Sequence, residues 1–86
     1  MKTIVENSTG ISKFVLEDST VVVMQDSQIV IGDPVQFVVA CHNQNDSTLH
    51  ENVTTVPADW SGNKYFFDGT TWTLNPDWID PATLEN

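Results

Sequence analysis

The first half of the chain is a succession of short apolar runs separated by pairs of turn-forming residues. The runs are SKFVLE, TVVVMQ, QIVIG and VQFVVAC, and the separating pairs are Asp18–Ser19, Asp26–Ser27 and Asp33–Pro34. Runs rich in β-branched residues, bounded by turn residues at regular short spacing, are typical of antiparallel strands joined by tight turns. The pattern therefore predicts an antiparallel meander.

Counting outward from a two-residue Asp–Ser loop gives the expected strand register. The expected cross-strand pairs are Leu16 with Val21, Phe14 with Val23, Met24 with Ile29, and Val22 with Ile31. The runs VVVM, IVI and FVVAC are apolar at successive positions, so both faces of these strands are apolar. Such strands are usually covered on both sides. We expect one cover to be the protein's own core, and the other to be the C-terminal half or another subunit.

The rest of the chain carries weaker signals. Residues 42–52 (HNQNDSTLHEN) are polar and turn-rich, and we expect them to form a long loop. The segment VTTV before Pro57 suggests one further strand. Only the terminal DPATLEN suggests a helical turn, with Pro81 at a suitable first position. The predicted class is all-β, with the meander and a C-terminal hairpin packed as a compact sandwich or a partly open barrel.

The C-terminal hairpin is predicted by YFFDGTTWTL, since Asp-Gly is a strong signal for a type I′ turn. That turn pairs Phe67 with Thr70, Tyr65 with Trp72, and Asn63 with Leu74. Side chains alternate along a strand, so one face of the hairpin is apolar and carries Tyr65, Phe67, Trp72 and Leu74. A lone hairpin is marginal in water. We therefore expect its apolar face to pack on the meander.

Three aromatic residues, Trp60, Phe66 and Trp78, lie outside that face or outside the hairpin. They are the candidates for contact with a partner or a ligand. The alternative is that they cover the edge of a small core. Both interpretations remain open from the sequence.

The composition of the chain disfavours some classes of function. The chain has 86 residues, enough for one domain over residues 1–86, with 40% hydrophobic residues and a net charge of −9 from twelve acidic residues and three lysines. This charge repels phosphate, and arginine is absent, so binding to nucleic acid or to anionic membranes is disfavoured. The N-terminus has no apolar signal segment, and no run reaches transmembrane length. We expect synthesis in a reducing cytoplasm.

No catalytic or metal-binding pattern stands out. Cys41 and His42 are adjacent, so on a strand they point to opposite faces, and with His50 they make no zinc spacing. Asp59, Asp68 and Asp77 recur at regular spacing, but they lack a calcium-loop pattern and are better explained as turn residues. We expect neither enzymatic activity nor a cofactor.

The stretch VPADWSGNKYFFDGTTWTLNPDW resembles a C-terminal pattern of small acidic proteins of tailed bacteriophages, especially the T4-like phages of marine cyanobacteria. The matching positions are Trp60, Gly62, Lys64, Tyr65, Asp68, Gly69, Thr71 and Trp72. The resemblance covers about a third of the chain and implies a virion component or a virion-associated protein. It implies no catalytic residue.

Three functions are compatible with these features. The first is a structural protein of the phage capsid, neck or tail, contacting copies of itself or other virion proteins. The second is a carbohydrate-binding module that stacks host-surface glycans on Trp60, Trp78 and Phe66. The third is a cytoplasmic inhibitor that presents an acidic surface to a basic host protein.

Overall fold

A computed structural model describes residues 1–79 of the chain. It contains eight short strands and no helix there, which confirms the all-β prediction. The strands are β1 (Lys2–Glu6), β2 (Ser12–Leu16), β3 (Val22–Met24), β4 (Ile29–Ile31), β5 (Phe37–Val39), β6 (Ser47–His50), β7 (Tyr65–Phe67) and β8 (Trp72–Leu74).

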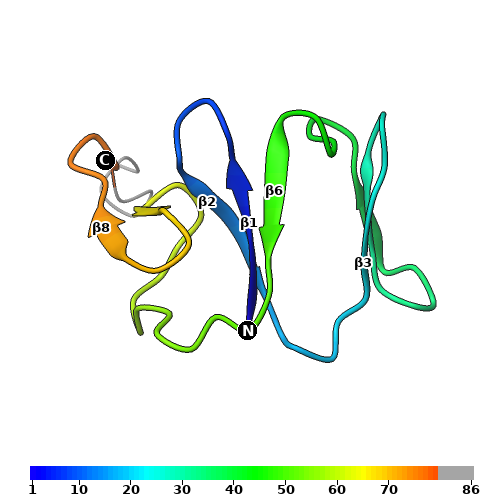
Figure 1. Ribbon diagram of the computed structural model, residues 1–86, viewed down its shortest axis with the longest axis horizontal. Coiled ribbons are helices and arrows are strands. Elements are labelled where there is room, and N and C mark those ends of the chain that lie inside the picture. Colours follow the sequence, from blue (N-terminus) through cyan, green and yellow to red (C-terminus); the bar gives the residue numbers. More distant parts are fainter. Residues whose placement is uncertain (80–86) are drawn as a thin grey trace, which may run out of the picture.

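The strands form three small antiparallel sheets, and they do not close into a barrel (Figure 1). The central sheet has the strand order β2-β1-β6. The order β3-β4-β5 defines what we call the valine sheet, and β7 with β8 forms the aromatic hairpin. In Figure 1 the central sheet lies between the valine sheet on the right and the aromatic hairpin on the left.

Each face of the central sheet contributes to a different core. On one face, Ile4 packs with Ile29, Ile31 and Val39 of the valine sheet, and the first three of these side chains are fully buried. On the other face, Val5 packs with Val53 and with Phe67 of the aromatic hairpin. Successive residues of β1 thus point into opposite cores, as alternation along a strand requires. The central sheet is the middle layer of the fold.

The predicted pairing of the first two apolar runs is wrong. Leu16 lies opposite Lys2 and Phe14 opposite Ile4, so β2 pairs with β1 instead of placing Leu16 against Val21 and Phe14 against Val23. The sequence pattern predicts no strand at Lys2–Glu6, which the structure shows as β1. Once β1 and β2 pair, β3 starts a second sheet that packs face to face on the first, and this arrangement fully buries Ile4. The pairing of Met24 with Ile29 and Val22 with Ile31 is confirmed.

The polar segment 42–52 is not simply a loop, because β6 lies within it and pairs with β1. Burial of a polar residue in this strand is compensated by a hydrogen bond. The buried Ser47 donates its hydroxyl to the Asp46 carboxylate at 2.8 Å. The segment VTTV does not form a strand. Val53 instead donates its amide to the Met1 carbonyl at 2.9 Å and buries its side chain. The terminal turn expected over DPATLEN begins at residue 80, outside the described residues.

The aromatic hairpin is present, but its loop is longer than expected. Phe67 lies opposite Trp72 and Tyr65 opposite Leu74, so residues 68–71 form the loop. Asp68 accepts hydrogen bonds from the amides of Thr70 and Thr71 at 2.9 and 2.7 Å, and this local bonding competes with the two-residue turn. The register changes by two positions, and an even change leaves each side chain on its predicted face.

Candidate binding surface

The outer face of the valine sheet carries a row of exposed apolar side chains. Val23, Val30 and Val38 lie opposite one another across the three strands. Val23 and Val38 are each 45% exposed, and Val30 is half-buried. Alternation places this row on the face opposite Ile29 and Ile31, away from the core. We call it the valine row.

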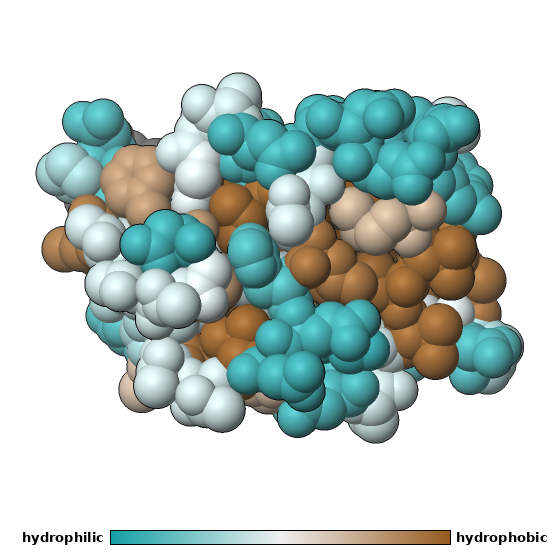
Figure 2. All heavy atoms as spheres, viewed as in Figure 1, coloured by the Kyte–Doolittle hydropathy of each residue, from teal (hydrophilic) through white to brown (hydrophobic). Residues whose placement is uncertain are grey.

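Further exposed apolar side chains lie near the valine row, and one of them, Phe37, lies opposite Ile31 and so belongs to the inner face of the sheet. Seven large hydrophobic side chains are exposed in the described chain, and five of them belong to the valine sheet or its turns. These five are Val21, Val23, Val35, Phe37 and Val38. Figure 2 shows apolar residues gathered over the valine sheet. Exposed apolar residues that are contiguous, rather than scattered singly, mark interaction sites.

This face lacks a cover because the C-terminal half packs elsewhere. The sequence predicts apolar residues on both faces of these strands, and it leaves open whether the C-terminal half or another subunit provides the second cover. In the structure, the aromatic hairpin and Val53 pack against Val5 on the far face of the central sheet. The described part of the chain therefore covers only the inner face of the valine sheet.

The three aromatic residues predicted to contact a partner are all half-buried. Trp60 donates its indole N–H to the hydroxyl of Ser12 at 3.0 Å, and Ser12 is fully buried, so Trp60 packs over the far face of the central sheet. Phe66 belongs to β7 and forms an isolated bridge with Ile11 next to the central sheet. Among the described residues, no ring-to-ring contact joins Trp60, Phe66 and Trp78.

Trp78 belongs to a polar cluster around Lys64. The Lys64 ammonium lies 4.8 Å from the centre of the Trp78 ring and 2.8 Å from the Asp59 carboxylate. Tyr65 donates its hydroxyl to the same carboxylate at 2.7 Å. The Lys64 hydrogen bond, followed by the Tyr65 one, lowers the pKa of Asp59. These contacts connect Asp59, before the aromatic hairpin, with Lys64 and Tyr65 at its start and with Trp78 after it.

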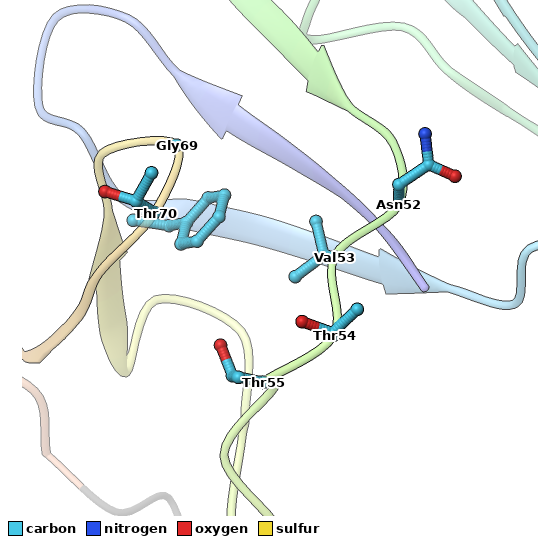
Figure 3. A pocket seen from close by; sticks show the side chains of 7 residues that line it. Asn52, Val53, Thr54, Thr55, Gly69 and Thr70 are labelled. Carbon is cyan, nitrogen blue, oxygen red and sulfur yellow. The ribbon is translucent and has the colours of Figure 1, made fainter.

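A small depression of about 260 Å³ lies between the aromatic hairpin loop and the segment after β6 (Figure 3). Its lining consists of Asn52, Val53, Thr54, Thr55, Phe67, Gly69 and Thr70. This volume is below the range of about 300–1,000 Å³ typical of ligand pockets. None of the lining residues carries a charged side chain.

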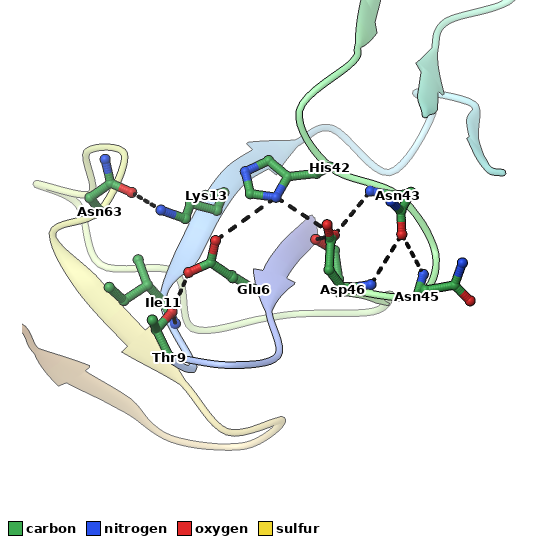
Figure 4. Close-up of polar contacts among 10 residues, drawn as sticks. Glu6, Thr9, Ile11, Lys13, His42, Asn43, Asn45, Asp46 and Asn63 are labelled. Atoms are coloured by element: carbon green, nitrogen blue, oxygen red, sulfur yellow. Dashed lines mark hydrogen bonds and ion pairs between the residues drawn. The ribbon is translucent and has the colours of Figure 1, made fainter. Parts of the chain in front are cut away.

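A histidine flanked by two carboxylates lies where the β5–β6 connection meets the end of β1 (Figure 4). His42 Nδ1 is 3.7 Å from Asp46 Oδ1 and 3.9 Å from Glu6 Oε2. The His42 side chain is only 14% exposed. The sequence gives no local signal for this cluster, because Glu6 is distant from His42 along the chain. When His42 is protonated, it can form an ion pair with both carboxylates.

Neither a metal site nor a membrane-spanning helix emerges from residues 1–79. No group of three or more His, Cys, Asp or Glu side chains in that range is placed to hold a metal ion. Asp59 and Asp68 are engaged in local hydrogen bonds. Within the same range, no helix is long and apolar enough to cross a bilayer.

The stability of the protein should depend on the ionised form of Asp68. Hydrogen bonds from the amides of Thr71 and Thr70 lower the pKa of this carboxyl below its ordinary value of 3.8. Because the folded-state pKa is the lower one, the stabilisation is present above pH 4 or so and is lost as pH falls through the folded-state value. We expect the melting temperature of the parent protein to fall in acid, and D68N to reduce this fall.

Thermal unfolding followed by circular dichroism, in steps from pH 6 to pH 2, measures this effect. The matched control is E17Q, which removes one exposed acidic charge that makes no side-chain hydrogen bond among residues 1–79. Its acid dependence should follow that of the parent. Parallel curves for D68N and the parent would show that Asp68 ionisation does not stabilise the fold.

Comparison with known proteins assigns no relative to this chain, since no family model, no curated protein and no solved structure matches it.

Proposed function

We propose that this protein is an assembly protein that functions by docking the outer face of its valine sheet onto another protein. The observation that carries the proposal is the valine row, in which Val23, Val30 and Val38 line up across three strands with no cover from residues 1–79. Burial of such a face against a partner contributes about 25 cal/mol per Å² of apolar surface. A small domain with a thin stability margin gains both binding energy and stability from that contact.

The setting we propose is the particle of a tailed bacteriophage. The support is the resemblance of residues 56–78 to small acidic phage proteins, together with a surface that suits protein contacts. A capsid, neck or tail offers many identical sites, and each would cover one valine row. The protein is synthesised in the host cytoplasm and is then incorporated into the particle, where its partners are other virion proteins.

Mass spectrometry of purified particles tests this proposal when the phage carries defined variants. The parent protein should be present at a constant ratio to the major shell protein. V23K places a charge in the valine row and should reduce incorporation by about tenfold or more, because burying an unpaired charge is costly.

The matched control is T73K, which places the same charge on an exposed position of β8 in the aromatic hairpin. It should be incorporated like the parent. Absence of the parent protein from the particles, or equal incorporation of V23K and T73K, would refute the proposal. Circular dichroism of both purified variants checks that each retains the folded state.

A further inference from the structure

β5 is an edge strand whose backbone is available for pairing. It is the last strand in the order β3-β4-β5, and its one strand neighbour is β4. Edge strands expose a row of N–H and C=O groups, and these groups form a template for another chain. The side chains around β5 are also open, since every residue from 33 to 38 is exposed.

The hydrogen-bonding pattern shows which β5 groups face outward. The Gly32 amide donates to the Val21 carbonyl at 2.7 Å, and the Gln25 amide donates to the Gln28 carbonyl at 2.9 Å. Hydrogen-bonded and non-bonded pairs alternate in an antiparallel ladder, so the backbone groups of Val30 turn toward β3. By the same alternation, the N–H and C=O of Val38 turn away from β4 and toward the open edge.

The edge at β5 lacks the features that usually prevent strand pairing. No charged residue and no proline occurs in VQFVVAC, residues 35–41. The edge at β2, by contrast, is covered by the Ile11–Phe66 bridge and by a hydrogen bond from the Asn63 amide to Ser12. Gln44 donates its amide to the Gln25 carbonyl, and this contact closes the end of β3. β5 is thus an edge strand with neither a charge nor a proline, and its side chains at Phe37 and Val38 are exposed.

We propose that β5 binds an extended segment of a partner chain, which adds a fourth strand to the valine sheet beside Val38. This inference deepens the proposed function, because it specifies how a partner would reach the valine row. Main-chain hydrogen bonds to Val38 provide affinity, and alternate side chains of the added strand extend the valine row on one face. On the other face they meet Phe37, whose ring lies 6.4 Å from that of Phe14 at the rim of the core.

The chemistry of the chain selects the partner, which we infer to be an apolar segment flanked by lysine or arginine. The net charge is −9. Each lysine already has a partner within the chain, with Lys2 bonded to Thr20, Lys13 to Asn63 and Lys64 to Asp59. An incoming basic segment is therefore attracted to the surface at long range.

A second copy of this chain is a poorer occupant. Two copies repel each other because each carries the same large negative charge. In the valine row, Val23 and Val38 are exposed and Val30 is half-buried, which is a small apolar surface for a symmetric interface between two copies. Strand addition gains its affinity from backbone hydrogen bonds and needs less apolar surface.

The test uses the designed peptide KKVTVTVKK as the probe and the ¹⁵N-labelled full chain. We expect saturable chemical-shift changes at the amides of Phe37, Val38 and Val39. A peptide of the same sequence and charge, N-methylated on alternate residues, loses the edge-facing donors and should bind about tenfold more weakly. V38P removes the outward N–H of Val38 and should weaken binding of the unmodified peptide in the same way.

If V38P does not fold, the affinities of the two peptides for the native chain still test strand addition. Equal affinity for both peptides, shift changes confined to other strands, or no shift change at all would overturn strand addition. Light scattering without peptide provides a further check, since a dimer with β5 at its interface would identify a second copy as the occupant and overturn the basic partner. If V23K still blocks particle incorporation while the peptides show no edge pairing, the assembly role stands and this inference fails.

Discussion

Replacement of Phe67 by alanine is expected to destabilise the protein by about 3–5 kcal/mol, a large share of the roughly 5–15 kcal/mol typical of a folded domain. The Phe67 ring is 4% exposed. Its centre lies 4.4 Å from that of Trp72 and 5.2 Å from that of His50, which it meets edge-on. The substitution therefore removes the contact through which the aromatic hairpin packs on the central sheet.

Urea unfolding followed by tryptophan fluorescence and circular dichroism measures this cost. The matched control is F66A, which removes the same side chain one position earlier, from the half-buried opposite face of β7. We expect F66A to cost clearly less than F67A. A cost for F66A equal to or above that for F67A would contradict the assignment of Phe67 to the core.

Replacement of Ile31 by alanine should cost about 2–5 kcal/mol, because it leaves a cavity between the central sheet and the valine sheet. Ile31 is fully buried and packs with Ile4, Ile29 and Val39. Val38 lies on the outer face of the same sheet and is 45% exposed. V38A is therefore the matched control, with an expected change within about 0.5 kcal/mol.

The comparison of I31A with V38A also tests which face of the valine sheet points inward. The two substitutions remove apolar groups from adjacent strands of one sheet, so strand propensity contributes similarly to both. Guanidinium unfolding of the purified proteins gives the two free energies. If V38A were as costly as I31A, the outer face would be packed in solution, and the valine row could not be a free docking surface.

The side-chain pattern predicts part of the binding surface. The runs VVVM, IVI and FVVAC predict strands with two apolar faces, and this prediction requires a cover for each face. The sequence does not say which segment covers which face. That outcome depended on the aromatic hairpin packing against Val5 and Val53, which left the valine row open.

The residue types of Trp60, Phe66 and Trp78 do not determine whether these side chains contact a partner or cover the core. A tryptophan outside a predicted strand suits a ligand platform as well as a core lid. The hydrogen bond from Trp60 to buried Ser12 depends on where β2 lies relative to residue 60. The sequence has no local signal that brings Trp60 close to Ser12. It also has no local signal that brings Glu6 close to His42 and Asp46.

The sequence by itself determined the features that depend on neighbouring residues. These are the all-β class, the pairing of Met24 with Ile29 and Val22 with Ile31 across a two-residue turn, and the face on which each hairpin aromatic lies. Turn chemistry and the alternation of side chains act over a few residues, so they can be read locally.

Only the tertiary structure decided which distant segments pair. β1 lies between β2 and β6, and the polar β6 was unrecognisable as a strand until β1 provided its partner. Local spacing does not encode such pairing, because strands far apart in the chain are selected by the total apolar area they bury together. For the same reason, the structure alone revealed that the middle layer is the central sheet and that the valine sheet keeps one face open.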